Sequence, residues 1–84
     1  MSTLNGKPLR ATGGYDQAIT AELQKRGRTD IHPACIEGWM RLQYGTLDHL
    51  DPDTFAAEVE IGIACHDDDP ATSERNARSY GLVA

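Results

Sequence analysis

Apolar residues recur at helical spacing in four segments of the chain, and proline or glycine bounds each segment. The first segment runs from about residue 15 to residue 26, and Gly27 is placed to close it in a left-handed conformation. Residues on one face of a helix recur at intervals of three and four positions, so this spacing predicts an amphipathic helix. Its apolar stripe consists of Tyr15, Ala18, Ile19 and Leu23.

The second segment opens with Pro33, which suits the first turn of a helix, and ends near Tyr44, with Gly45 beyond it. Trp39 is the only tryptophan, and we expect it to anchor the core. The apolar face of this predicted helix is formed by Ile36, Trp39, Met40 and Gln43, flanked by Cys35 and Leu42.

The third segment covers residues 51–66 and begins with Asp51 as a helix cap before Pro52. Apolar residues occupy two of its faces, which is typical of either a central helix or an interface helix. Gly62 would let a neighbouring helix approach closely. One face carries Phe55, Val59, Gly62 and Ile63, and the other carries Ala57, Ile61, Ala64 and Cys65.

Asp69 and Pro70 repeat the cap-and-proline signal and predict a fourth helix that ends at Tyr80, before Gly81. No segment shows the alternation of a half-buried strand. We therefore predict an all-α fold, a small bundle of about four short helices. Residues 1–13 predict a flexible N-terminal arm, and residues 14–84 a single helical domain, which a length of 84 residues allows.

Charge is distributed unevenly along the chain. The 13 acidic and 8 basic residues give a formal net charge of −5, and residues 42–74 contain nine of the acids and no Lys or Arg. No apolar run reaches the length of a membrane span, and the N-terminus lacks the apolar core of a signal peptide. Two cysteines are too few for a disulfide framework. We therefore expect a cytoplasmic protein that does not enter membranes.

A metal site is one candidate for chemistry. His32 and Cys35 are three residues apart at a helix start, and Cys65 could approach them from an antiparallel helix, so these three are the candidate zinc ligands. His49 and His66 could also bind a metal. The sequence lacks the paired spacings of a zinc motif. The alternative is that both cysteines are buried apolar residues and the histidines cap helices or face solvent. We expect no cofactor.

The sequence contains no local motif that is typical of a catalytic site. Cys65 could pair with His49 or His66 as a nucleophile, but the spacing does not require it. The carboxylates near residues 51–53 and 67–69 could serve acid–base chemistry only if two of them faced one cleft. A solvated acidic surface is the simpler interpretation, so the sequence predicts no enzyme.

The second and third predicted helices, joined by a short link, superficially suggest a helix-turn-helix. The helix that would enter the major groove carries several acids and no base, so phosphate groups would repel it. We therefore expect no direct binding of nucleic acid.

The acidic stretch is the strongest candidate for function. Asp67 and Asp68 lie at the expected C-terminal end of the third helix, where negative charge opposes the helix dipole, and neither has an evident local role. An acidic face can bind a basic surface, although acids also keep small proteins soluble. The candidate partner-binding residues are Asp48, Asp51, Asp53, Glu58, Glu60, Asp67 and Asp68, with Tyr44, Tyr80 and Arg41 as secondary candidates.

These features predict a non-enzymatic binding protein that docks on a basic surface of a larger protein, such as one that handles nucleic acid, and inhibits it. In size and charge the chain resembles the small acidic single-domain proteins of phages and other mobile elements, which include anti-CRISPR proteins. The resemblance implies inhibition of a host defence complex by a surface that mimics nucleic acid.

The alternative is a small helical regulatory module that self-associates through a homodimer of helix 51–66. The burial of Ile61 discriminates between the two hypotheses. Self-association predicts that Ile61 is buried only at an interface, and the alternative is that it is buried inside the monomer. Less favoured alternatives are a zinc-stabilised module and a DNA-binding module.

Overall fold

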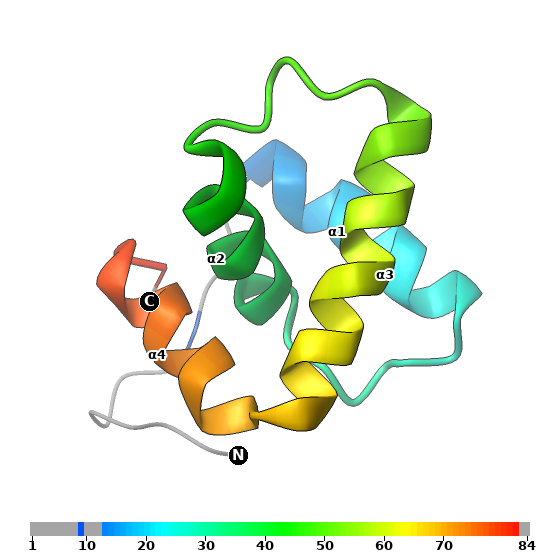
Figure 1. Ribbon diagram of the computed structural model, residues 1–84. Helices are drawn as coiled ribbons and strands as arrows, with labels where there is room; N and C mark the ends of the chain where they lie inside the picture. Colours follow the sequence, from blue (N-terminus) through cyan, green and yellow to red (C-terminus); the bar gives the residue numbers. More distant parts are fainter. Residues whose placement is uncertain (1–8, 10–12, 83–84) are drawn as a thin grey trace.

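The computed structural model describes residue 9 and residues 13–82, which form four α-helices and no β-strand (Figure 1). The helices are α1 (Gly13–Lys25), α2 (Pro33–Tyr44), α3 (Pro52–Asp68) and α4 (Pro70–Ser79). The predicted all-α bundle is therefore confirmed. Of the arm predicted over residues 1–13, only Leu9 and Gly13 lie among the described residues. Leu9 packs against the core, and Gly13 begins α1.

Side-chain caps and prolines start three of the helices. Asp51 caps α3 by accepting a hydrogen bond from the Thr54 amide, at 2.8 Å from nitrogen to Oδ1. Asp69 does the same for α4 through the Thr72 amide at 3.2 Å, and His32 caps α2 by accepting from the Ala34 amide at 3.0 Å. Each cap precedes a proline, whose fixed φ suits the first helical turn.

Two helix ends differ from the prediction by two residues, and the others agree to within one residue. Helix α1 begins at Gly13 rather than near residue 15, and α3 continues to Asp68 rather than ending at residue 66. Nothing between Cys65 and Asp69 breaks a helix, and the Asp69 amide still donates to the Cys65 carbonyl at 3.0 Å. Pro70, which disfavours helical geometry in the residue before it, sets the boundary.

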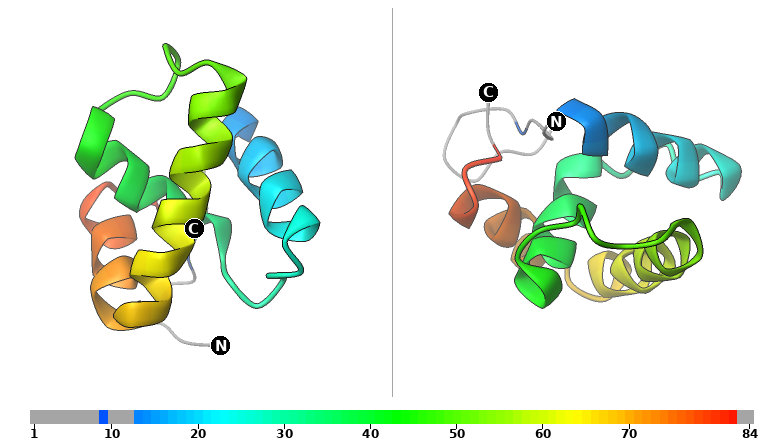
Figure 2. Two further views of the ribbon diagram at one scale, coloured as in Figure 1. Left: turned by 45° about the vertical axis from the view of Figure 1, so that its right-hand side comes forward. Right: turned by 90° about the horizontal axis from the view of Figure 1, so that it is seen from above.

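Helix α2 is the centre of the molecule. It packs against α1, α3 and α4, and the views from two sides show it between α4 and the pair formed by α1 and α3 (Figures 1 and 2). Helix α3 buries only one stripe, formed by Val59, Gly62 and Ile63. The sequence left α3 as either a central or an interface helix, and the central role is wrong, because its second apolar face remains exposed.

The core lies where α1, α2 and α3 meet. Its buried side chains come from all three helices and from the segments that join them. Trp39, the expected anchor, is half-buried and packs against the edge of this core rather than inside it. The buried members are Ile19, Leu23, Ile31, Cys35, Ile36, Met40, Leu47, Val59 and Ile63.

Helices α2 and α4 are in close backbone contact at Gly38. A Cβ atom added there would lie 2.7 Å from the backbone nitrogen of Ala77, which is too close for any real contact. Gly62, the glycine that the sequence singled out, has more room, because an added Cβ would lie 3.4 Å from the nearest side-chain atoms of Ile36 and Trp39. The crossing of α2 and α4 therefore depends on Gly38.

Candidate docking surface

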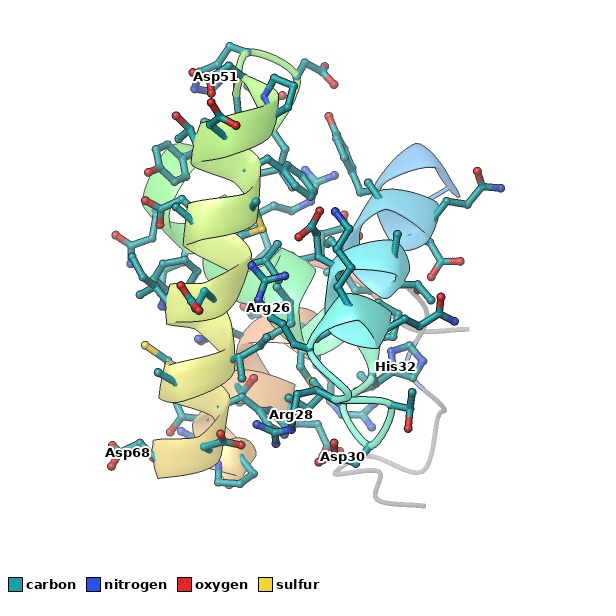
Figure 3. All side chains as sticks on the ribbon, turned by 90° about the vertical axis from the view of Figure 1, so that its right-hand side faces the viewer. Arg26, Arg28, Asp30, His32, Asp51 and Asp68 are labelled. Carbon is teal, nitrogen blue, oxygen red and sulfur yellow. The ribbon has the colours of Figure 1, made fainter. Side chains whose placement is uncertain are left out.

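Ion pairs within the fold engage most of the bases. Among the described residues, Lys25 and Arg26 both pair with Glu22, Arg41 pairs with Glu37, and Arg78 pairs with Glu74. Figure 3 shows Arg26 and Arg28 between α1 and α3, on the side of α3 that faces the bundle. The acids of the stretch 48–66 take part in none of the ion pairs that these described bases form.

Asp67 has a local role that the sequence did not reveal. Its carboxylate accepts two hydrogen bonds from the guanidinium of Arg28, each 2.7 Å long, and Arg28 also contacts Asp30 at 3.1 Å. These bonds hold the pKa of the Asp67 carboxyl below its usual range and raise the pKa of Arg28. The expectation that Asp67 lacks a local role is therefore wrong, because this pair ties the end of α3 to the α1–α2 loop.

Three of the predicted acids lie at the N-terminal end of α3. Asp51 is occupied as the cap, and its hydrogen bonds to Thr54 lower its pKa. Asp48 accepts a hydrogen bond from the hydroxyl of Tyr15, which raises the pKa of that tyrosine. Asp53, in the first turn, is exposed and forms no ion pair with any described residue.

Several other candidate residues are engaged inside the molecule. The hydroxyl of Tyr44 donates to Glu58 at 2.7 Å, which joins α2 to α3 and raises the pKa of Tyr44. Arg41 donates to the fully buried Glu37 at 2.8 Å, and its guanidinium lies 5.5 Å from the centre of the Tyr15 ring. Tyr80 is 42% exposed but lies at the end of α4, away from the acidic stretch in sequence.

A continuous exposed stripe runs along α3 on the side away from the bundle. At 100° per residue, Asp53, Glu60 and Asp68 fall within an arc of about 80°, and successive acids are about 10 and 12 Å apart along the axis. All three are exposed, and none is in an ion pair with a described residue. We call this stripe the outward face of α3; its members are Asp53, Ala57, Glu60, Ile61, Ala64 and Asp68.

The outward face mixes charge with exposed apolar surface. Ile61, at its middle, is 48% exposed. Asp68 points away from Arg28 and Asp30 (Figure 3). Adjacent residues on a helix diverge by about 100°, which explains why Asp67 turns toward Arg28 while Asp68 faces solvent. Of the seven predicted acids, the structure thus brings Asp53, Glu60 and Asp68 onto one free face.

A groove lies beside this face, between α2, α3 and α4, with a volume of about 350 Å³. Leu42, on its α2 side, is 54% exposed and adds apolar surface to the groove. In the sequence, Leu42 lies at the edge of the apolar stripe of the second helix. This position was the only indication in the sequence that an apolar side chain would be exposed beside the core. Its lining residues are Trp39, Leu42, Cys65, Asp68, Asp69, Thr72, Ser73 and Asn76.

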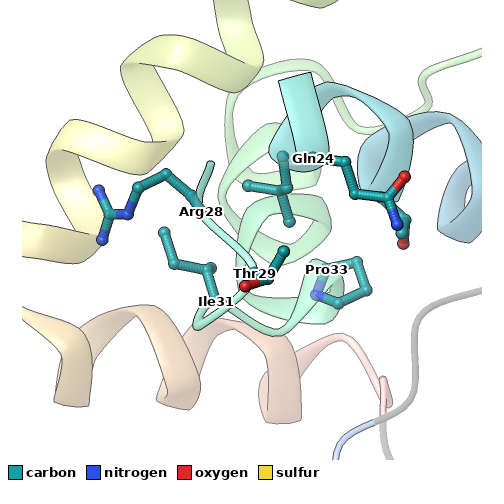
Figure 4. A pocket seen from close by; sticks show the side chains of 7 residues that line it. Gln24, Arg28, Thr29, Ile31 and Pro33 are labelled. Atoms are coloured by element: carbon teal, nitrogen blue, oxygen red, sulfur yellow. The ribbon is translucent and has the colours of Figure 1, made fainter. Parts of the chain in front are cut away.

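A second, smaller hollow of about 200 Å³ lies near the α1–α2 loop (Figure 4). Its lining includes Thr20, Gln24 and Thr29, and Arg28 extends from it toward α3 rather than into it. Since that guanidinium is occupied by Asp30 and Asp67, the hollow presents no free charge to a ligand.

The candidate metal ligands are dispersed. His32 is occupied as the cap of α2, Cys35 is buried, and Cys65 is exposed on α3. Burial raises the pKa of the Cys35 thiol and lowers that of His32. His49 lies edge-on to the ring of Tyr44. Within residues 13–82 and Leu9, no three histidine, cysteine or acidic side chains come together as a metal would require.

His66 of α3 and Ser73 of α4 form a side-chain contact, a pair of residue types that also occurs in catalytic sites. His66 Nδ1 lies 3.0 Å from the Ser73 hydroxyl oxygen, and that hydroxyl donates to the Cys35 carbonyl at 3.4 Å. The donor in the contact between His66 and Ser73 is set by the tautomer of the His66 ring. A nucleophilic serine also needs a base that a third group orients. The contact therefore joins α2, α3 and α4 structurally.

None of the described helices combines the length and apolar character needed to cross a bilayer. The sequence and the structure were compared with protein-family models, curated proteins and solved structures, and none of the three comparisons gives a match.

Proposed function

We propose that this chain is a non-enzymatic binding protein that docks through the outward face of α3 on a basic surface of a larger protein and blocks that surface. One observation carries the proposal. Asp53, Glu60 and Asp68 lie on one exposed face without a cationic partner among the described residues, and the half-exposed Ile61 lies between them. Such a face offers a partner both charge and apolar contact area.

A basic partner suits this face better than a second copy of the chain. If two α3 helices packed antiparallel about residues 60 and 61, Asp53 would lie opposite Asp68 of the other copy. Parallel packing would set each acid opposite its own counterpart. Helix α3 contains no Lys or Arg to relieve this repulsion. Lysine or arginine residues on a different protein would relieve it and would also speed association.

The blocked surface is one that otherwise binds phosphate groups. Carboxylates spaced along a rigid helix can occupy lysine and arginine side chains that contact a nucleic-acid backbone. This mode of action accords with the resemblance in size and charge to anti-CRISPR proteins. Both cysteines are free thiols, and we therefore place the activity in the reducing cytoplasm.

The test is capture of a partner from host lysate by the purified protein at low and at high salt. The proposal expects a protein with a basic surface that is retained at low salt and released at high salt, because screening weakens exposed charge pairs. It also expects the captured protein to lose its binding of nucleic acid when this chain is added. Capture that does not respond to salt would contradict the proposal.

Self-association is the second candidate, and the exposure of Ile61 in the monomer favours it. Light scattering at several protein concentrations separates the two. A homodimer that dissociates upon Ile61→Lys would support self-association through α3, whereas a monomer at all concentrations would exclude it.

A further inference from the structure

We propose that the groove between α2, α3 and α4 receives a large apolar side chain from a cationic amphipathic helix of the partner. This inference rests on the proposed function and deepens it, because it states the chemistry of the segment that docks. The occupant is a protein helix rather than a nucleic acid or an anionic membrane, since the acids around the groove repel both of these.

The walls of the groove supply apolar surface. Trp39 and Leu42 contribute from α2 and Cys65 from α3, while Thr72 and Asn76 of α4 form the opposite side. Its volume of about 350 Å³ is at the lower end of ligand pockets and is sufficient for a leucine or phenylalanine side chain. Burial of the half-exposed Leu42 by such a side chain would remove apolar surface from water.

Charge around the groove selects a cationic occupant. Asp68 and Asp69 both line the groove, and neither is in an ion pair with a described base. The carboxylate of Asp69 accepts hydrogen bonds from the amide and the hydroxyl of Thr72, which lower its pKa and keep it ionised. The charge of Arg75 also acts on Asp69 and helps to lower its pKa. Lysine or arginine residues flanking the inserted side chain would lie against these two acids.

The groove and the outward face of α3 form one continuous surface. Asp68 belongs to both, and Cys65 in the groove is one helical turn from Ile61 on the face. A partner helix could therefore insert one apolar residue beside Trp39, cover Ile61 with a second, and direct its cationic residues to Glu60 and Asp68. Apolar residues at positions i, i+3 and i+4 with lysines between them have this pattern.

Trp39 provides the readout, because it is the only tryptophan and lines the groove. The probe is a 14-residue helical peptide of lysine and leucine, without tryptophan, added to the full chain. The control peptide replaces every leucine with alanine and keeps the charge. We expect a saturable change in Trp39 fluorescence with the leucine peptide and at least tenfold weaker binding of the alanine peptide.

Alkylation of Cys65 with N-ethylmaleimide blocks the groove without changing net charge. Cys65 is exposed, whereas Cys35 is buried and its raised pKa keeps it protonated. We expect alkylation to weaken binding of the leucine peptide at least tenfold. A Cys65→Ser variant treated identically should bind as the untreated protein does.

The outcomes separate this inference from the proposed function. Three results would overturn the proposal that the groove binds an apolar side chain. These are equal binding of both peptides, leucine-peptide binding that alkylation does not change, and no binding of either peptide. If one of these results is found while capture from lysate still depends on salt, the groove proposal fails and the proposed docking through the outward face of α3 remains supported. Leucine-peptide binding that persists at full strength in Glu60→Gln/Asp68→Asn would contradict both the preference of the groove for a cationic helix and the acidic docking face, whereas weaker binding to this variant supports both.

Discussion

At the scale of single residues, chemically identical carboxylates perform different tasks. Asp51 and Asp69 cap helices, Asp67 binds Arg28, and Asp68 faces solvent. The caps could be predicted because their hydrogen bonds are local and each precedes a proline. The role of Asp67 could not, because its partner lies 39 residues away in the sequence and only tertiary packing brings the two together.

Asp67→Asn should lower stability at neutral pH. The folded-state pKa of Asp67 lies below the unfolded value, so its contribution is fully present above about pH 4 and disappears as the pH falls through the folded pKa. Urea unfolding should therefore show a larger difference from the unmodified protein at pH 7 than at pH 2.5. The neighbouring Asp68→Asn should show no such loss at pH 7, because Asp68 forms no ion pair with a described residue and its charge opposes the helix dipole. A pH-independent loss in Asp67→Asn would contradict this account.

Gly38→Ala should destabilise the fold by about 1–3 kcal/mol, because the new methyl group meets the backbone of Ala77 and α4 must move. Gly62→Ala is the matched control. The added methyl group would lie at ordinary van der Waals distance from the side chains of Ile36 and Trp39, and alanine favours the helix over glycine. The free energy of unfolding should therefore stay the same or rise by up to about 1 kcal/mol. Urea unfolding of the two variants checks the prediction, and equal effects would show that the α2–α4 crossing is not as close as described.

At the scale of helices, the number of helices and the starts of α2, α3 and α4 followed from the sequence, but their arrangement did not. Caps and prolines are local signals, whereas the position of a helix in a bundle depends on its neighbours. Helix α2 is central because its small residues Ala34 and Gly38 admit α4 on one side while Ile36 and Met40 face the core. The two apolar faces of α3 could not reveal which would be buried.

Two isoleucines of α3 that are separated by Gly62 test which face of this helix is buried. Ile63 is 8% exposed and Ile61 is 48% exposed. Ile63→Ala should cost about 2–5 kcal/mol through lost core packing, whereas Ile61→Ala should stay within about 0.5 kcal/mol. Urea unfolding measures both. A large loss for Ile61→Ala would mean that this residue is buried in solution, against the placement of the outward face.

At the scale of the whole molecule, some acidic residues bind a residue of another segment of the chain, whereas others face solvent. The uneven charge of residues 42–74 could be predicted from the sequence alone. Which acids remain free depends on pairing between helices: Glu58 is held by Tyr44 and Asp67 by Arg28, while Asp53, Glu60 and Asp68 share a free face. Three carboxylates are thereby directed outward along one side of α3, which is the physical basis of the proposed docking.

The most direct measurement is the affinity of the captured partner for two charge-matched variants. Glu60→Gln/Asp68→Asn and Gln17→Lys/Gln24→Lys both raise the net charge by about two units; the first alters the outward face of α3 and the second alters exposed positions on α1. The account predicts at least tenfold weaker binding and a smaller salt dependence for the α3 variant, with little change for the α1 variant. Equal weakening in both would show that net charge alone drives binding, and it would contradict a docking face on α3.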